Sequence, residues 1–298
     1  MPWKVLYNMK LLTFRYNGKE KVGVLTADGK SVMPIGPLGL PYDTMVELID
    51  HITPEQRAAL ENGKIPGLPL DEVELLAPIP VPRQDIVCLG INYMAHAEEG
   101  ARYHNEAFGG ERPFPIYFSK RVNEAVGHGG FIESHQDIEE RLDYECELAV
   151  IIGKDAKNVK AGEEWDYIFG YTILNDISAR ILQTRHKQWY FGKSLDGFTP
   201  MGPWIVTRDE FQDPPSLAVR SYVNGELRQN STTDLLIFDI PYVLRELTQG
   251  MTLKAGTIIA MGTPAGVGMG FDPPRFMKPG DTVTCEIEGI GQLTNTVK

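Results

Sequence analysis

Two glutamates inside an apolar stretch are the first candidates for a catalytic or metal-binding role. Glu145 and Glu147 lie two positions apart in YECELAVIIG, residues 144–153, and in a β-strand such positions project from the same face. If the strand is buried, a cation or arginine side chains must compensate the two carboxylates. The same spacing also fits the solvent-facing side of an amphipathic strand, so this pair alone leaves both interpretations open.

A third acid, Asp176, ends another apolar stretch, YTILND, residues 171–176. An acid at this position can simply cap a following helix, here one that opens at Ser178. Together with Glu145 and Glu147, however, it would supply three hard oxygen ligands without His or Cys nearby. Such a ligand set suits Mg²⁺ or Mn²⁺, so we predict a site for one of these cations.

A histidine and an acid three residues apart indicate a general base. His96 and Glu99 lie in GINYMAHAEE, residues 90–99, and on a helix residues i and i+3 share a face. The Glu99 carboxylate could orient the imidazole and raise its basicity. An exposed surface pair is the simpler alternative, and the neighbouring Glu98 could take the place of Glu99. The other histidines match no catalytic pattern and are expected to be solvated or structural: His51, His104, His128, His135 and His186.

Two hydrogen-bond donors follow later in the chain. Gln183 comes seven residues after Asp176, and Lys193 stands in the aromatic, turn-rich stretch WYFGKSLDGF, residues 189–198. Both side chains could donate to an oxyanion that develops during a reaction.

The secondary-structure elements predicted to carry these residues are mostly β-strands. Alternating or continuous apolar patterns predict strands at residues 85–90, 115–119, 144–153, 167–176, 202–207, 218–229 (a hairpin that turns at Asn224-Gly225), 256–262 and 281–291. Helical patterns are fewer and shorter, at residues 93–99, 178–187 and 241–248. Because strands do not alternate regularly with long helices, a doubly wound parallel sheet is disfavoured and we expect a β-rich α+β fold.

A β-meander is predicted near the beginning of the chain. The strand-like stretches LLTFRY and KVGVLT, residues 11–16 and 21–26, are followed by the turn signals Asn17-Gly18 and Asp28-Gly29. The residues before Met9 fit no such pattern, so either Met1 or Met9 could be the native start.

A helix and a stiff linker follow the meander. Thr53 and Gln56 form a capping box that begins the helix. The proline-dense stretch LAPIPVP, residues 76–82, can continue neither a helix nor a central strand. We therefore expect a small N-terminal accessory domain at residues 1–75 and a catalytic domain at residues 76–298.

The composition excludes several classes of protein. Of the 298 residues, 42% are hydrophobic and 23% charged, which is typical of a globular protein. The net charge of −11 would repel a phosphate backbone, so nucleic acid is not an expected partner. No stretch approaches the roughly 18 apolar residues that span a bilayer, so we expect a cytoplasmic protein without membrane contact. Its three cysteines form no CxxC and are expected to be reduced and buried.

Four motifs in order resemble the fumarylacetoacetate hydrolase family: E-x-E within DYECELAVIIG, then NDISAR, FGKSLDGFTPMGP and GTPAGVG. The resemblance extends from about Asp85 to the C-terminus. It implies a mixed β-roll catalytic domain, usually dimeric, with a divalent metal bound by two glutamates and an aspartate, here Glu145, Glu147 and Asp176. The N-terminal meander resembles the small accessory domain of bacterial two-part members.

The same resemblance assigns roles to further residues. It implies that the His96–Glu99 pair lies on a lid helix and that Lys193 and Gln183 line the site. Arg180 could bind a substrate carboxylate through its bidentate fork, or could equally pair with an acid on a helix surface.

The function that follows is divalent-metal-dependent hydrolysis of a C–C bond in acylpyruvate-like 2,4-dioxo acids. His96, oriented by Glu99, would take a proton from water, and Lys193 and Gln183 would stabilise the oxyanion. Thr263, in GTPAGVG, would offer its hydroxyl and neighbouring amides to a carboxylate, because the glycines let the backbone come close. Oxaloacetate decarboxylation and 2-hydroxyhepta-2,4-diene-1,7-dioate isomerisation are alternatives on the same site, and a non-catalytic metal-binding scaffold is the alternative from another class.

Overall fold

One large sheet runs through the molecule and takes strands from both parts of the chain. The computed structural model describes residues 9–63, 65–107, 110 and 113–298, so the residues between the two possible starts, 1–8, lie outside the described residues. In spatial order the sheet contains β4 (Leu68–Pro69), β3 (Ser31–Pro34), β2 (Lys19–Leu25), β1 (Lys10–Tyr16), β13 (Met201–Thr207), β11 (Ile168–Asn175), β10 (Cys146–Ile152), β16 (Ile258–Ala260), β6 (Ile86–Gly90) and β7 (Ile116–Lys120), with β5 (Glu74–Leu75) paired to β1.

A second sheet packs against the middle of the first. Its strands are β15 (Glu226–Thr232), β14 (Ala218–Val223), β17 (Thr282–Ile287), β18 (Gly291–Val297) and β8 (Phe131–Ile132), and a separate short pair is formed by β9 (Leu142–Asp143) and β12 (Ser178–Ala179). Leu148 and Val150 of β10 share a buried cluster with Val219 of β14 and Ile287 of β17. The β-rich α+β fold predicted from the sequence is confirmed.

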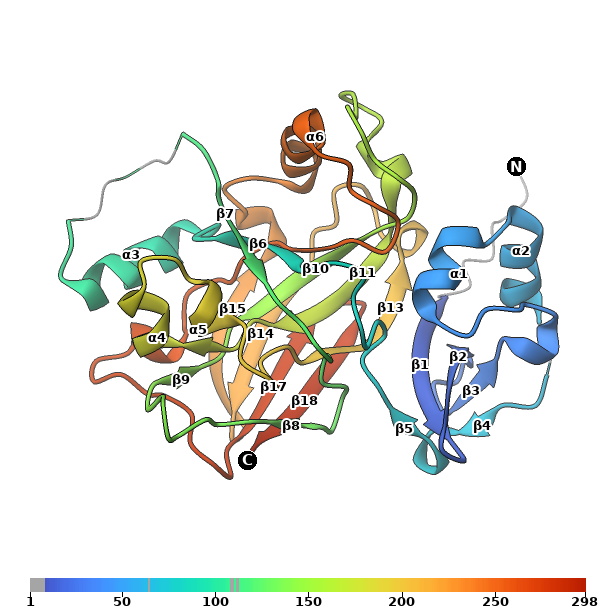
Figure 1. Cartoon of the computed structure of the whole chain (residues 1–298), viewed down its shortest axis with the longest axis horizontal. Helices are drawn as coiled ribbons and strands as arrows, with labels where there is room; N and C mark the ends of the chain where they lie inside the picture. The colour runs from blue at the N-terminus through green and yellow to red at the C-terminus, as the bar shows by residue number, and fades with distance from the viewer. Residues whose placement is uncertain (1–8, 64, 108–109, 111–112) are drawn as a thin grey trace.

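The helices lie at the two ends and along one edge of the molecule. They are α1 (Met45–His51), α2 (Pro54–Asn62), α3 (Met94–His104), α4 (Arg180–Arg185), α5 (Tyr190–Lys193) and α6 (Ile240–Gly250). Figure 1 shows α1 and α2 beside the N-terminal strands at one end, and α3, α4 and α5 at the other. The predicted capping box of Thr53 and Gln56 is confirmed at the start of α2. None of the helices in the described part of the chain is long and apolar enough to cross a membrane.

The helix predicted at residues 178–187 is shorter than expected. Ser178 and Ala179 pair with Asp143 and Leu142 as the β12–β9 ladder, so α4 begins only at Arg180. Asp176 therefore caps no helix, since the N-cap residue of α4 is Ala179 and the first-turn amides of Ile181 and Leu182 donate instead to the Glu139 carboxylate, each at 3.1 Å. Pairing across the chain has replaced a local helical preference here.

The N-terminal strands and the rest of the chain share a core. Leu11 of β1 lies opposite Ile205 of β13, and it belongs to one buried cluster with Ala149 and Ile151 of β10. The predicted linker also contributes to this cluster through Ile79. We propose that residues 1–75 are an accessory part that is fused to the catalytic part through this common sheet and core.

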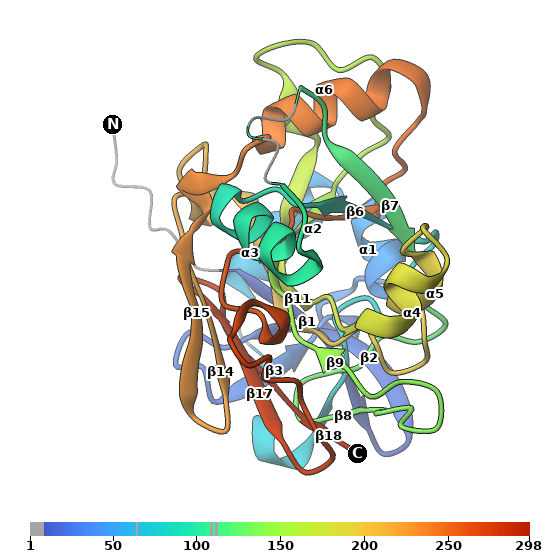
Figure 2. The same cartoon turned by 90° about the vertical axis from the view of Figure 1, so that its left-hand side faces the viewer.

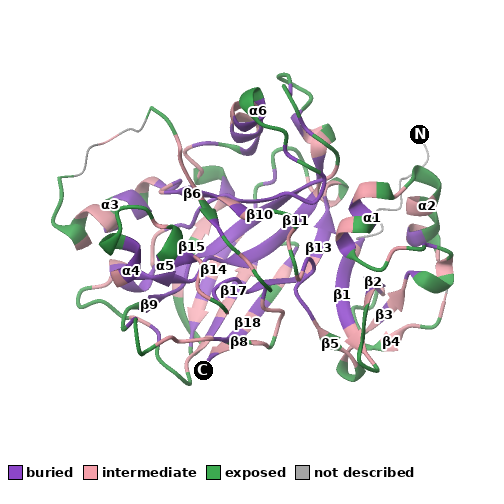
Figure 3. Ribbon diagram, viewed as in Figure 1, coloured by how far each residue is buried: buried purple, intermediate pink, exposed green. Residues whose placement is uncertain are grey.

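The central strand β10 is buried on both faces, as Figure 3 shows. Leu148 and Val150 point into the cluster that faces the second sheet, whereas Ala149 and Ile151 point into the opposite one. Because side chains alternate along a strand, Glu147 continues the face of Ala149 and Ile151. This alternation places the Glu147 carboxylate in the interior at the start of β10.

Candidate metal-dependent active site

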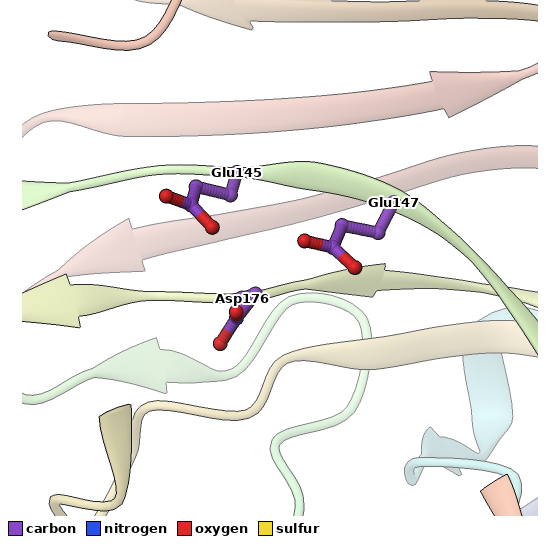
Figure 4. Close-up of side chains that lie close together, drawn as sticks. All are labelled: Glu145, Glu147 and Asp176. Carbon is purple, nitrogen blue, oxygen red and sulfur yellow. The ribbon is translucent and has the colours of Figure 1, made fainter. Parts of the chain in front are cut away.

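Glu145, Glu147 and Asp176 meet where β10 begins and β11 ends, and Figure 4 shows their carboxylates close together. The antiparallel register pairs Cys146 with Asn175, and the amide of Asp176 donates to the carbonyl oxygen of Glu145 at 2.8 Å. One oxygen from each of the three side chains lies within 4.8 Å of the others, and all three residues are buried. The structure thus brings together the acids predicted to be metal ligands.

Three buried cations compensate part of this negative charge. Lys193 Nζ lies 2.6 Å from both Glu145 Oε2 and Asp176 Oδ2. Arg180 Nη1 lies 2.7 Å from Glu145 Oε1, and Lys120 Nζ donates to Asp176 Oδ1 at 2.7 Å. Burial alone would raise the pKa of the Glu145 carboxyl, but Lys193 and Arg180 hold this pKa well below its usual range. Glu145 is therefore ionised at neutral pH.

Glu147 forms no ion pair with any lysine or arginine of the described residues. Its Oε2 accepts a hydrogen bond from the amide of Gly262 at 2.8 Å. Burial, and then the negative charges of Asp176 and Glu145, raise the pKa of the Glu147 carboxyl well above its usual range. A cation among the three carboxylates would offset both effects, so the site has a chemical reason to bind one.

His96 and Glu99 lie on the same face of α3. His96 Nδ1 is 3.4 Å from Glu99 Oε2, and both residues are buried. The other carboxylate oxygen, Oε1, accepts a hydrogen bond from the amide of Gly266 at 2.8 Å, which ties α3 to the glycine-rich loop. Glu98 is exposed. Glu99 rather than Glu98 is therefore in position to orient the imidazole.

Arg180 is held by Asp143, an acid that no sequence pattern indicated. Its Nε donates to Asp143 Oδ2 at 2.9 Å, and its Nη1 donates to Gln183 Oε1 at 3.1 Å. Since Arg180 is only 4% exposed, the alternative of a surface ion pair is wrong. Its Nη2 also lies 2.9 Å from Asp143 Oδ2, yet this buried nitrogen is aligned with no hydrogen-bond acceptor in the described part of the chain. It can donate to a ligand.

A cavity of about 490 Å³ opens above the acids. Figure 2 shows α3 on one side of this region and α4 and α5 on the other. The cavity is lined by seven of the nine residues singled out from the sequence: His96, Glu145, Glu147, Arg180, Gln183, Lys193 and Thr263. The other two, Glu99 and Asp176, lie behind this lining and contact its members. A cavity of this size accommodates a small organic acid.

The rest of the lining, here called the outer wall, differs in character from the acids and cations of the floor. It contains Leu89, Ala97, Ala101, Phe118, Trp189 and Met269, together with the exposed, charged or titratable His104, Glu106 and Lys187. A ligand whose polar end contacts the acids would therefore extend between apolar side chains toward a charged mouth.

Comparison with known proteins identifies the family. The profile described as Fumarylacetoacetate (FAA) hydrolase C-terminal matches residues 85–298. The chain belongs to the fumarylacetoacetate hydrolase family. The resemblance noted in the sequence is thereby confirmed, and the family is one of enzymes that includes hydrolases, isomerases and tautomerases.

Three relatives illustrate the range of this family. The oxaloacetate tautomerase YisK of Bacillus subtilis is 48% identical over 228 residues, which cover 76% of this chain and 74% of that protein. The structure of the fumarylacetoacetate hydrolase of Exiguobacterium antarcticum is 39% identical, with a TM-score of 0.82 over 97% of this chain and 99% of that one. A maleylpyruvate hydrolase from Sphingobium, in complex with manganese(II) and pyruvate, is 30% identical, with a TM-score of 0.77 over 97% and 98% of the two chains.

Thr263 of this family member does not offer its hydroxyl proton as expected. The hydroxyl donates to the carbonyl oxygen of Cys146 at 3.0 Å and accepts a hydrogen bond from Gln229 Nε2 at 2.7 Å. The proton predicted to bind a substrate carboxylate is thus already used. The side chain instead fastens the loop at residues 262–268 to the start of β10.

Lys120 is a second residue of the site, besides Asp143, that sequence reasoning missed. It ends β7, where a lysine after an apolar strand ordinarily reaches solvent, but it is fully buried. Besides Asp176, its Nζ donates to the carbonyl oxygens of Ile177, at 3.1 Å, and Lys193, at 2.5 Å. It therefore connects a predicted metal ligand to the backbone of the helix that carries Lys193.

Replacing Lys120 by Met is expected to lower the free energy of unfolding of the metal-free protein by about 3 kcal/mol, because a buried carboxylate loses a partner. This loss lies at the lower end of the range that is usual when one partner of a buried ion pair is removed, because Lys193 still contacts Asp176. Mn²⁺ should restore part of the loss by supplying positive charge. Urea unfolding with and without Mn²⁺ measures both effects, with the exposed Lys160→Met as control. A Lys120→Met protein as stable as the wild type would contradict the assigned role.

Proposed function

We propose that this chain is a divalent-metal-dependent enzyme that moves a proton at the carbon next to the keto group of a small 2-oxo acid. Oxaloacetate keto–enol tautomerisation is the first candidate reaction. The observation that carries the proposal is the buried acid triad, with its uncompensated Glu147, at the floor of a cavity that His96 also lines. The 48% identity to an oxaloacetate tautomerase favours this substrate.

Mg²⁺ or Mn²⁺ is the proposed cofactor, held by Glu145, Glu147 and Asp176. An all-oxygen donor set suits both ions, and the maleylpyruvate hydrolase relative was solved with manganese(II). When bound, the cation would polarise the 2-oxo oxygen and acidify the neighbouring C–H group.

The side chains of the cavity can carry out the remaining steps. His96, oriented by Glu99, takes the proton from the carbon next to the keto group and returns it to oxygen. The Lys193 ammonium has three N–H donors, of which Glu145 and Asp176 use two, so the third can stabilise the developing enolate oxygen. The Nη2 of Arg180, which lies 2.9 Å from Asp143 Oδ2 but is aligned with no acceptor among the described residues, binds the substrate carboxylate. Gln183, which accepts from Arg180 through Oε1, keeps its amide N–H groups for the substrate.

Hydrolysis of acylpyruvate-like 2,4-dioxo acids is the second candidate. The Sphingobium hydrolase, solved with pyruvate, favours it, and the same His96 could take a proton from water instead of carbon. Lys193 and Gln183 would then stabilise the oxyanion that forms when hydroxide attacks the distal carbonyl. Oxaloacetate decarboxylation and diene-dioate isomerisation also pass through an enolate, so the same side chains would serve them. We further propose that the chain forms a homodimer, since two-fold symmetry is the commonest assembly.

A side-by-side turnover assay tests the proposal. Purified protein is treated with EDTA, reloaded with Mg²⁺ or Mn²⁺, and given enol-oxaloacetate or acetylpyruvate, with loss of the enol or diketone absorbance as the signal. We expect metal-dependent tautomerisation well above the rate with metal and buffer alone, and faster than acetylpyruvate hydrolysis. The order of the two candidates reverses if acetylpyruvate is the better substrate. Absence of metal-dependent turnover with both substrates would refute the proposed function.

A further inference from the structure

The charge of the inner site limits how many substrate carboxylates it can hold. The carboxylates in and directly around the acid triad are those of Asp143, Glu145, Glu147 and Asp176, and the cations that contact them belong to Lys120, Arg180 and Lys193. With a divalent cation bound and all four acids ionised, four negative charges would face five positive ones. One carboxylate of a 2-oxo acid would use the excess positive charge, so a second carboxylate would need a cation elsewhere.

Lys187 is the lysine at the outer wall of the cavity. Its side chain is exposed, and within the described residues its ammonium forms neither a hydrogen bond nor an ion pair, unlike the two buried lysines of the inner site. The other titratable groups at the outer wall are His104 and Glu106. Lys187 is therefore the group there that carries a permanent positive charge.

The backbone holds Lys187 in a conformation that lysine rarely adopts. Its φ angle of 62° is left-handed, which costs a residue with a Cβ atom on the order of 1 kcal/mol. The residue lies in the turn between α4, which carries Gln183, and α5, which carries Lys193. Glycine would relieve the strain at this position. The turn therefore sets the direction in which the Lys187 side chain leaves the backbone, between the helices that carry Gln183 and Lys193.

We propose that Lys187 is a specificity-determining residue whose ammonium binds a second anionic group at the far end of the substrate. The cavity then selects 2-oxo acids that end in a carboxylate over those that end in a methyl group. Between the two charged ends, the chain of the substrate lies against apolar side chains such as Phe118 and Trp189. This inference rests on one part of the proposed function, namely that the acid triad and Arg180 bind the end of the substrate that carries the 2-oxo acid group.

Two 2-oxo acids of equal chain length, which the site can neither hydrolyse nor decarboxylate, test the selection by binding. 2-Oxoglutarate ends in a carboxylate and 2-oxopentanoate in a methyl group, and the Kd of each for the Mn²⁺-loaded full-length protein is measured by calorimetry. The wild type should bind 2-oxoglutarate roughly tenfold more tightly than 2-oxopentanoate. This ratio is at the lower end of what one charged hydrogen bond contributes to binding, because Lys187 is exposed. Lys187→Met should bring the ratio of the two Kd values close to one. Lys187→Arg should keep the preference, and Lys187→Glu should reverse it.

Lys160→Met, which removes an exposed lysine that does not line the cavity, serves as the matched control and should keep the wild-type ratio. Equal Kd values for the two probes in the wild type would overturn the inference, as would a preference that survives in Lys187→Met. Because binding is measured without turnover, a wild-type preference that Lys187→Met removes supports the inference even if oxaloacetate and acetylpyruvate are not turned over. In that case the proposed function alone would fail.

Discussion

The Glu147→Gln protein is expected to bind Mn²⁺ or Mg²⁺ at least about 100-fold more weakly than the wild type and to lose its activity on 2-oxo acids. Glu145 and Asp176 already contact Lys193, and they are further paired with Arg180 and Lys120. Glu147 has only an amide hydrogen bond from Gly262. It is therefore the acid whose charge is left for a metal ion, and a neutral amide would remove that attraction.

The stability of the same variant separates metal loss from unfolding. In the metal-free state Glu147→Gln should be at least as stable as the wild type, because it removes a buried carboxylate that lacks an ion-pair partner. Mn²⁺ should raise the melting temperature of the wild type but not of the variant. Calorimetric titration and thermal unfolding after EDTA treatment measure both effects, with the exposed Glu140→Gln as control. Full activity of EDTA-treated Glu147→Gln protein would show that this acid holds no catalytic metal.

Removal of His96 is expected to lower the rates of some of the reactions that the site could catalyse much more than others. In His96→Ala, oxaloacetate tautomerisation and acylpyruvate hydrolysis should fall by about 10²–10⁴-fold in kcat, the usual worth of a positioned general base. Oxaloacetate decarboxylation needs no base to remove a proton, so it should keep much of its rate. Glu145→Gln should reduce all three reactions together, because all three depend on the metal.

Two neighbouring glutamates provide a matched control for the role of His96. Glu99→Gln removes the charge next to the imidazole and should lower the base-dependent rates less than His96→Ala does. Glu98→Gln changes an exposed side chain one position away and should leave them unaltered. Tautomerisation, hydrolysis and decarboxylation are measured side by side in the variants. Equal losses of all three reactions in His96→Ala would mean that His96 acts in substrate binding or helix closure instead of proton transfer.

Much of the local structure could be predicted from the sequence because the signals lie within a few residues of each other. The turn signals Asn17-Gly18 and Asn224-Gly225 both lie between paired strands. The capping box of Thr53 and Gln56 begins a helix. The i, i+3 spacing of His96 and Glu99 brings their side chains together on α3. In each case the backbone geometry of one helix or one hairpin is sufficient to bring the residues together.

Local sequence signals predicted the arrangement of the acid triad only in part. The two-residue period puts Glu145 and Glu147 on one side of the chain, but the sequence could not tell a buried strand from a half-exposed one. Packing on both faces of β10 settles this point. The register with β11 then places Asp176 opposite Glu145, a contact that depends on how two strands align.

The pairing of the buried carboxylates with lysine and arginine could be seen only in the tertiary structure. Lys120 reaches Asp176 from 56 positions away, and Asp143 holds Arg180 from 37 positions away. Lysine at the end of an apolar strand and arginine at a helix start ordinarily reach solvent, so neither type nor spacing indicates a buried partner. The candidate catalytic and metal-binding residues could be recognised from the sequence alone, because residue types and the i, i+2 and i, i+3 spacings are local properties. Their pairing required the fold, since burial and strand register depend on the whole chain.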